Sequence, residues 1–337
     1  MYATIVRFGA GFALLLTILT SRAISQSPVQ LKGSGWTAST NVGPALATDG
    51  NNAYIAWVDS STLDIYFATY TGYGFDSAQT VGGTKLDGTV WTAQSDVTPT
   101  WGYDGVSFFL FWKGKSGNDL WFSSYNGTAW SLQQKVQGTS PSWTGETDVA
   151  PSAAFLSWPA TLFWKGASGN KIWTSSFNDL TPGWLTQEIT TGPTTNVAPG
   201  VESSPNSSGG TVPIFVKSAS SNDIFAWVGT TTKYKVSGSG WTAETKQAPA
   251  AALDAYGNDI VFWTGQTGTS IWYSSNTSTS MVFGGSPVWS TQATVSGAKT
   301  NAAPTVAEAN GPSIFVALLA WKNASDNAVW YLDISKL

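Results

Sequence analysis

The sequence contains no cysteine and no histidine, and its only arginines, Arg7 and Arg22, lie within the first 25 residues. Disulfides and thiolate metal sites are excluded, so packing alone must hold the fold. A Ser-His-Asp triad, a histidine metal site and a thiol nucleophile are excluded as well. We therefore expect no cofactor and no metal.

One catalytic arrangement survives these absences, a pair of carboxylates as in glycosidases. The acidic residues that could supply such a pair are scattered along the chain, and their spacing does not say whether any two converge. We expect the protein not to be an enzyme. The candidates are Asp104, Glu146, Asp148 and Asp254.

Charge is scarce too, at 11% of residues. Without the two arginines, the 16 basic residues leave 14 lysines against 20 acidic residues, a net charge of −6. No basic patch is present, and nucleic-acid binding depends on clustered Lys and Arg. Nucleic acid is therefore excluded as a partner.

Long apolar runs are absent except for Phe8 to Thr20. At about 13 residues this stretch is too short to span a bilayer comfortably. Arg7 precedes it, and Ala23-Ile24-Ser25 offers small residues for cleavage. We predict that residues 1–25 are an export signal and that residues 26–337 form one secreted, extracellular domain without membrane insertion.

Tryptophan, in contrast, is abundant, with 19 residues, and it marks a repeat. Six first anchors are each followed nine residues later by a second anchor, with Gly, Ser, Asn and Asp between them, as a tight hairpin needs. The sequence therefore predicts a hairpin of strands B and C in each repeat. The pairs are Trp57 and Tyr66, Trp112 and Trp121, Trp164 and Trp173, Val216 and Phe225, Trp263 and Trp272, and Trp321 and Trp330.

Two further markers complete the repeat. A proline precedes the first anchor by 13 to 17 residues and suits the first residue of a strand A, because it lacks an N–H donor. An aromatic residue often opens a strand D. Four short strands in each of six repeats predict an all-β, six-bladed β-propeller with antiparallel blades. The prolines are Pro44, Pro99, Pro151, Pro199, Pro249 and Pro304, and the aromatics are Phe75, Trp130, Trp184, Tyr234 and Trp289.

The last repeat lacks a strand D, since only seven residues follow Trp330. The segment from Val29 to Thr40 closely copies the segment from Lys235 to Thr245, which is a strand D and the loop after it. We predict that the N-terminal strand pairs with the C-terminal blade and closes the ring, which removes an exposed edge. An open array of blades is the alternative.

The loops between strands D and A carry a second repeat. An indole stands eight residues before the proline, an Asn or Asp usually three before it, and several strands B end in lysine. Alternating strands place all three on one face. Indoles stack on pyranose rings, and carbonyls and amines bind hydroxyls. The predicted carbohydrate-binding residues are Trp36, Trp91, Trp143, Trp241, Asn41, Asp96, Asp148, Lys113 and Lys165.

Each of these residues also has a structural explanation. Both faces of a blade are buried, so the strand tryptophans and the strand C aromatics are expected between blades. The loop tryptophans can equally be core, the Asn and Asp side chains can stabilise a turn, and lysines at strand ends are usually solvated.

The string Trp321-Lys-Asn-Ala-Ser-Asp326-Asn-Ala-Val-Trp330, echoed from Trp112 to Trp121, resembles the repeat of the bacterial PLL-type propeller lectins and, more loosely, the tectonins. The resemblance implies a lectin. PLL-type lectins have seven blades and usually Arg where this chain has Lys, so their fucose-type specificity does not carry over.

Another string, Ser123-Ser-Tyr-Asn-Gly127-Thr-Ala-Trp130, resembles the Asp-box of sialidase-type propellers, one residue short of the usual spacing. This box is a structural turn. Sialidases hold their substrate through an arginine triad, and no arginine follows residue 25, so the sequence argues against a sialidase.

Taken together, the sequence predicts a secreted lectin or adhesin that binds glycans or glycoconjugates, of the cell surface or matrix, through several weak, equivalent sites on one face. A protein-binding or structural propeller without a sugar site is the alternative. A glycosidase with a carboxylate pair is the third reading.

Overall fold

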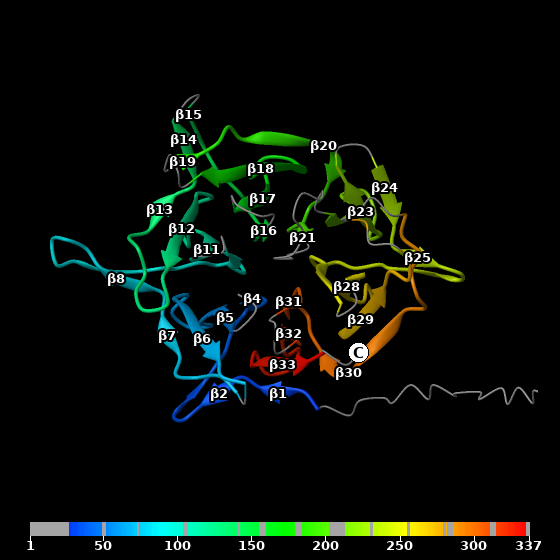
Figure 1. Cartoon of the computed structure of the whole chain (residues 1–337), viewed down its shortest axis with the longest axis horizontal. Helices are drawn as coiled ribbons and strands as arrows, with labels where there is room; N and C mark the ends of the chain where they lie inside the picture. The colour runs from blue at the N-terminus through cyan, green and yellow to red at the C-terminus, as the bar shows by residue number, and fades with distance from the viewer. Residues whose placement is uncertain are drawn as a thin grey trace, which may run out of the picture.

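Six small antiparallel sheets stand around a central axis in the computed structural model (Figure 1). The described residues contain no α-helix, and the fold is a six-bladed β-propeller, as the repeat predicts. The predicted export signal lies outside the described residues. The structure describes residues 27–48, 52–72, 74–103, 107–139, 142–154, 160–178, 183–201, 213–229, 232–254, 257–278, 281, 286–310 and 315–334.

The first three blades follow one another along the chain, with the innermost strand first. Blade 1 contains β4 (Ala45–Thr48), β5 (Ala53–Val58), β6 (Ile65–Tyr70) and β7 (Gln79–Thr80). Blade 2 contains β10 (Thr100–Tyr103), β11 (Phe108–Lys113), β12 (Leu120–Tyr125) and β13 (Gln134–Lys135). Blade 3 contains β16 (Ser152–Ala154), β17 (Thr161–Lys165), β18 (Lys171–Asn178) and β19 (Gly183–Trp184), and β20 (Glu188–Thr194) also pairs with β18.

The other three blades repeat this order and complete the ring. Blade 4 contains β21 (Gly200–Val201), β22 (Ile214–Lys217), β23 (Ile224–Val228) and β24 (Thr232–Lys235). Blade 5 contains β27 (Ala250–Leu253), β28 (Asp259–Thr264), β29 (Ser270–Ser275) and β30 (Ala293–Lys299). Blade 6 contains β31 (Thr305–Asn310), β32 (Phe315–Lys322), β33 (Val329–Asp333) and the N-terminal β1 (Val29–Gln30).

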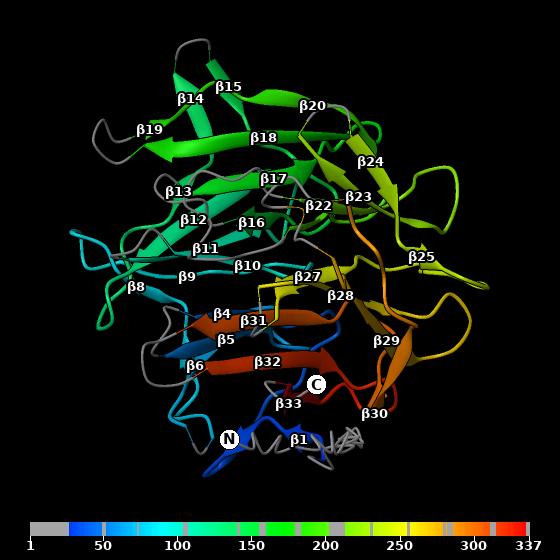
Figure 2. The same ribbon diagram turned by 45° about the vertical axis from the view of Figure 1, so that its right-hand side comes forward.

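Ring closure occurs as predicted. Gln30 lies opposite Trp330 and Val29 opposite Tyr331, so β1 supplies the outer strand of blade 6 (Figure 2). The amide of Leu31 extends the pairing by donating to the carbonyl of Val329, and the Leu31 side chain is fully buried. The first described strand therefore covers the edge that the last blade would otherwise expose.

The six anchor pairs are direct cross-strand partners in every blade, from Trp57 opposite Tyr66 to Trp321 opposite Trp330. Directly opposite residues point to the same face of a sheet, so each pair packs as one unit. The first anchors are buried, with Trp112, Trp164, Trp263 and Trp321 at most 2% exposed. The second anchors are only half-buried, so the predicted burial of the strand C aromatics is partial.

Each of the six prolines immediately precedes the innermost strand of its blade, as predicted. All six line one narrow central channel of about 110 Å³, together with the small residues beside them. An inner strand has a neighbour on one side only, and a residue without an N–H is tolerated at its start. The prolines thus narrow the channel where the six blades meet.

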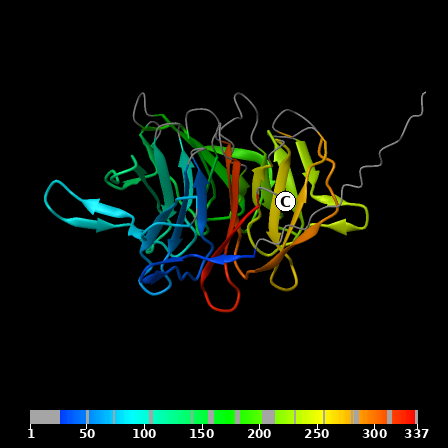
Figure 3. The ribbon, with the colours of Figure 1, turned by 60° about the horizontal axis from the view of Figure 1, so that its bottom comes forward.

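Four connections between blades are not simple loops but short hairpins that project outward, most clearly β8–β9 (Figure 3). The predicted aromatic openings of strand D are also displaced, since Phe75, Trp130 and Trp289 form isolated bridges before their outer strands begin. The hairpins are β2 (Lys32–Gly33) with β3 (Trp36–Thr37), β8 (Gly82–Thr84) with β9 (Val90–Thr92), β14 (Gln137–Thr139) with β15 (Ser142–Thr144), and β25 (Ser237–Gly238) with β26 (Trp241–Thr242).

Candidate functional site

The six loops that lead into the innermost strands each contain a turn with a fully buried Ser or Thr. In the loop before blade 3, the Thr147 hydroxyl donates to the carbonyl of Val149 at 3.0 Å and accepts from its amide at 3.2 Å. The prediction that the adjacent Asn or Asp makes the turn is therefore incomplete. A Ser or Thr four residues before every proline was the signal. The six are Thr40, Ser95, Thr147, Thr195, Thr245 and Thr300.

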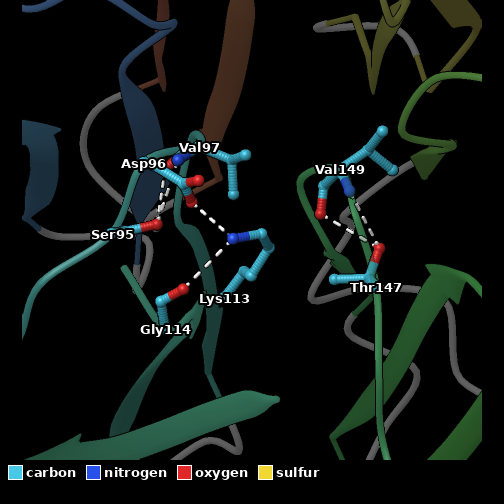
Figure 4. A network of polar contacts seen from close by, with 7 residues as sticks. All are labelled: Ser95, Asp96, Val97, Lys113, Gly114, Thr147 and Val149. Atoms are coloured by element: carbon cyan, nitrogen blue, oxygen red, sulfur yellow. Dashed lines mark hydrogen bonds and ion pairs between the residues drawn. The ribbon is translucent and has the colours of Figure 1, made fainter. Parts of the chain in front are cut away.

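Strand-end lysines and loop Asn or Asp side chains meet directly, as the alternation of strands predicts. Lys113 donates to Asp96 at 2.6 Å and to the carbonyl of Gly114 at 3.1 Å (Figure 4). Lys165 binds Asp148 at 2.5 Å in the next blade. These lysine side chains are only 5% exposed, whereas the two aspartates are 45% and 48% exposed. The expectation that strand-end lysines are solvated is wrong for these residues.

Two further blades keep the lysine and replace the carboxylate by an amide. Lys217 donates to Oδ1 of Asn196 at 2.7 Å, and Lys322 donates to Oδ1 of Asn301 at 2.8 Å. Burial lowers the pKa of both ammonium groups below the usual value for lysine. At Lys322 the charge of Asp326 works against this lowering of the pKa.

The remaining blades have neither arrangement. In blade 5, Thr264 ends strand B and its hydroxyl donates to the carbonyl of Ala302, while the loop position is occupied by the exposed Lys246. In blade 1, Val58 ends strand B, and Asn41 donates through Nδ2 to the carbonyl of Ser60 while its Oδ1 accepts from Asn327. Strand B therefore ends without a lysine in blades 1 and 5, and in blade 5 a lysine occupies the loop position instead.

Above the prolines the channel widens into a bowl of about 270 Å³. Its floor is largely apolar, and Asn41, Asp148, Gln247 and Asn301 bring polar side chains to it. Concave, mainly apolar cavities with a few polar groups are typical of small-molecule sites. The floor residues are Val42, Gly43, Val97, Thr98, Val149, Ala150, Val197, Ala198, Ala248, Ala302 and Ala303.

The four loop tryptophans lie in the projecting hairpins rather than at the bowl. Each faces a glycine of its own hairpin, and a Cβ on Gly138 would lie 2.0 Å from Nε1 of Trp143. Three also stack on the first anchor of the following blade, as Trp241 does on Trp263 at 6.3 Å and 7°. Trp91 and Trp143 are buried, and Trp36 and Trp241 are half-buried. Their role in sugar binding stays a prediction.

A separate cleft of about 240 Å³ lies between blade 2 and the β8–β9 hairpin. The half-buried ring of Trp121 lines it together with Gln94, Lys115 and Gln133. The amide of Lys115 donates to the carbonyl of Gln94 at 3.1 Å, which fixes the turn of blade 2 against the hairpin loop. The ammonium of Lys135 lies 5.4 Å from the Trp121 ring centroid. Spacing alone had assigned this ring to the core.

The same contact between turn and loop recurs beside other second anchors. The amide of Ala167 donates to the carbonyl of Glu146 at 3.1 Å, and the amide of Gln266 donates to that of Glu244 at 3.0 Å. Trp173 and Trp272, the second anchors of these two blades, are half-buried like Trp121. This backbone contact is a general feature of the repeat, and in blades 3 and 5 it lies beside a half-buried tryptophan, as in blade 2.

The described carboxylates that could serve a glycosidase lie in different surroundings. Glu146 is exposed, and its backbone forms an isolated bridge with Asp119. Asp148 is engaged by Lys165, and Asp254 binds Asn258 at the opposite end of an inner strand. Asp104 lies outside the described residues. Within the same residues, no group of three or more His, Cys, Asp or Glu could hold a metal ion. The described chain also contains no helix long and apolar enough to cross a membrane.

No model of a known protein family matches the sequence, and a search of curated proteins found no relative. Solved structures do match the fold. The Hadza microbial sialidase Hz136 matches with a TM-score of 0.56 and 11% identity, over 89% of this chain and 67% of its own. A variant of NanB sialidase from Streptococcus pneumoniae matches with a TM-score of 0.58 and 9% identity, over 92% and 70%.

At these identities the likeness shows the six-bladed propeller fold alone. Both neighbours are named as sialidases. The six blades found here differ from the seven of PLL-type lectins.

Proposed function

We propose that the protein is a non-catalytic, secreted lectin or adhesin that binds glycans through several weak sites on the face carrying the bowl and the hairpin loops. The cleft beside Trp121 carries this proposal. It joins a partly exposed indole to Gln94, Gln133 and Lys115. The amide nitrogen of Gln94 donates to Asp64 at 2.7 Å and the ammonium of Lys115 to the carbonyl of Thr62 at 3.4 Å, so both side chains are held by blade 1. An indole supplies an apolar platform, and amides supply both donors and acceptors for hydroxyls.

Repetition supports weak, multiple binding. A site with one ring and few polar groups gains little over water, because its hydrogen bonds replace those to solvent. The half-buried Trp173 and Trp272, which occupy the position of Trp121 in blades 3 and 5, would provide further sites at fixed separations on one ring. Simultaneous engagement raises avidity by about 10²–10⁴ over a single site. Two sialidases share this fold, and a carbohydrate-related function in such a fold is consistent with glycan binding.

Catalysis is not part of the proposal. Asp96 and Asp148, on the loops before blades 2 and 3, each receive a hydrogen bond from a buried ammonium. An acid–base pair in a glycosidase needs one carboxyl group protonated and the other free to act as nucleophile or base. Two carboxylates that are both held by lysine do not supply this division.

A glycan array with the chain from residue 26 onward tests the function, followed by calorimetry with a bound glycan. We expect Gln133→Ala and Trp121→Ala to reduce binding about tenfold or more, since each removes a group from the cleft. Gln134→Ala is the matched control, because adjacent residues point to opposite sides of a strand. A folded protein that binds no glycan, or cleft variants that bind like Gln134→Ala, would contradict the proposal.

A further inference from the structure

Three asparagines in the described part of the chain stand in the pattern Asn-X-Ser/Thr, in which X is not proline, and the proposed binding sites use none of them. This pattern is the acceptor for N-linked glycans in secreted proteins when the asparagine lies on an accessible surface turn. The pattern alone treats the three as equal, whereas their surroundings in the fold differ. They are Asn126, Asn276 and Asn323, and a fourth, Asn206, lies outside the described residues.

Asn126 is exposed in the turn that follows β12 in blade 2. Its Oδ1 accepts from the amide of Thr128 at 3.0 Å, from the Thr128 hydroxyl at 2.9 Å and from the amide of Ala129 at 2.9 Å. These three hydrogen bonds engage the oxygen of the side-chain amide and fix its orientation. Nδ2 has no hydrogen-bond partner among the described residues, so the nitrogen that would carry a glycan is accessible.

Asn276 lies in the turn that follows β29 in blade 5, which is the same connection of the repeat, but it is only 1% exposed. Its Nδ2 donates to Oδ2 of Asp259 at 2.7 Å, and Asp259 is fully buried. Its Oδ1 accepts from the amides of Ser278 and Val288, both at 3.0 Å. A glycan on Nδ2 would break the bond to the buried carboxylate and displace the turn, which leaves buried polar groups without partners.

Asn323 is intermediate between these two. It is half-buried in the turn between β32 and β33. Its Nδ2 donates to Oγ of Ser325 at 3.2 Å and to Oδ1 of Asp326 at 2.9 Å. The nitrogen is therefore engaged twice, once by the hydroxyl of its own Asn-X-Ser pattern. Among the three described asparagines, Asn126 combines an exposed side chain with an unengaged Nδ2.

The position of Asn126 in blade 2 also decides which face a glycan would occupy. Lys113 ends β11 on the face that carries the bowl, and Trp112 beside it pairs with Trp121 of the cleft. Phe108, at the other end of β11, pairs with Tyr125, the residue directly before Asn126. A glycan on Asn126 would therefore project from the face opposite to the bowl and leave the cleft uncovered.

We propose that Asn126 is an N-glycosylation site on the face opposite to the bowl, and that the fold prevents the same modification at Asn276. The inference rests on the secretion that the proposed function includes. In the reaction, Nδ2 of Asn126 forms a bond with C1 of an oligosaccharide carried on a lipid diphosphate. The bond from C1 to the diphosphate oxygen breaks, the diphosphate leaves with the electron pair, and Nδ2 loses one proton.

The chain from residue 26 onward, secreted by a eukaryotic host behind a leader of that host, tests the inference. Peptide mass analysis of the folded protein, before and after enzymatic removal of glycans, measures the occupancy of each site. We expect most molecules to carry a glycan at Asn126, fewer at Asn323 and none at Asn276. Asn126→Gln and Thr128→Ala should each abolish the glycan on this turn, whereas Thr128→Ser keeps the required hydroxyl and should retain it. Thermal melts verify the folding of every variant.

A folded protein without a glycan at Asn126 would overturn the inference. So would a glycan at Asn276 in a protein that melts like the unmodified one. Wild type and Asn126→Gln should give the same signals on a glycan array, and signals that depend on the Asn126 glycan would overturn its placement on the opposite face. Glycosylation at Asn126 in a protein that binds nothing on the array would support the inference and reject the proposed function. Array binding by a protein without a glycan at Asn126 would do the reverse.

Discussion

At the residue scale, four lysines at the ends of strands B are buried, and each donates to an Asn or Asp side chain of a loop between blades. Position in the repeat predicts that lysine and Asn or Asp meet on one face, and they do. The burial of these lysines could not be predicted, because a lysine at a strand end is usually solvated and the spacing of the repeat does not show which residues cover it. The buried Ser or Thr turns escaped notice for a related reason, since the neighbouring Asx residue offers the same turn chemistry.

The pair in blade 3 gives an asymmetric prediction. Asp148→Ala should cost about 1–3 kcal/mol of unfolding free energy, because it leaves the buried ammonium of Lys165 with only the carbonyl of Gly166. Lys165→Met should cost less, since it keeps the apolar stem and leaves a half-exposed carboxylate that water can solvate. Urea unfolding of both variants measures the difference, with Asp148→Asn as the control nearest to wild type. A larger loss for Lys165→Met would show that the ammonium is not dependent on its partner.

At the element scale, the periodicity predicted strands well and their connections poorly. The nine-residue spacing gave all six cross-strand pairs, and the prolines marked every inner strand. The sequence does not distinguish the four hairpins between blades from loops, because runs such as Gly33-Ser34-Gly35 are typical of both. A Trp facing a Gly across two short strands was the signal, since Gly138 lies where only a residue without Cβ fits beneath Trp143.

Strand β1 provides the element-scale prediction. Starting the mature chain at Lys32 removes β1 and the fully buried Leu31, which exposes the edge of β33 and part of the core it shares with blade 1. We expect a large fall in the thermal midpoint or aggregation. Leu31→Ala isolates the packing contribution and should cost about 2–5 kcal/mol. A truncated protein that melts like the full mature chain would count against closure by β1.

At the scale of the whole molecule, the order of the repeats along the sequence predicts some features of the ring and not others. Six repeats and a displaced strand D define a closed ring, so blade count and closure were predictable. The bowl exists only when the ring is closed, because residues of the loops before all six blades line it. Half-burial of Trp121 depends equally on how far the neighbouring hairpin reaches, which its sequence does not state. The predicted meeting of lysines with Asn and Asp side chains on one face is confirmed, whereas the sugar-binding role of the predicted residues stays a prediction.

The seam between blades 1 and 6 leads to a prediction about alkaline pH. Tyr331 of β33 packs against Phe75 at 5.1 Å and Tyr70 at 6.2 Å, so the closing blade meets the first blade through aromatic contacts. Burial, and then the neighbouring Tyr70, raises the pKa of Tyr331, while burial and then Asp333 raise the pKa of Tyr70. The stability that these neutral phenols contribute is complete below the ordinary tyrosine pKa of 10.0 and is lost as pH rises through the higher folded values.

Tyr331→Phe should therefore make the free energy of unfolding decline less between neutral pH and about pH 11. Lys217 and Lys322 act in the opposite direction, because their lowered pKa values favour folding as pH rises. Both lysines are present in wild type and in Tyr331→Phe, so the difference in pH dependence between the two proteins reports the contribution of Tyr331. Denaturant unfolding at a series of pH values measures it, and curves that decline in parallel would mean that Tyr331 does not hold the seam through its neutral form.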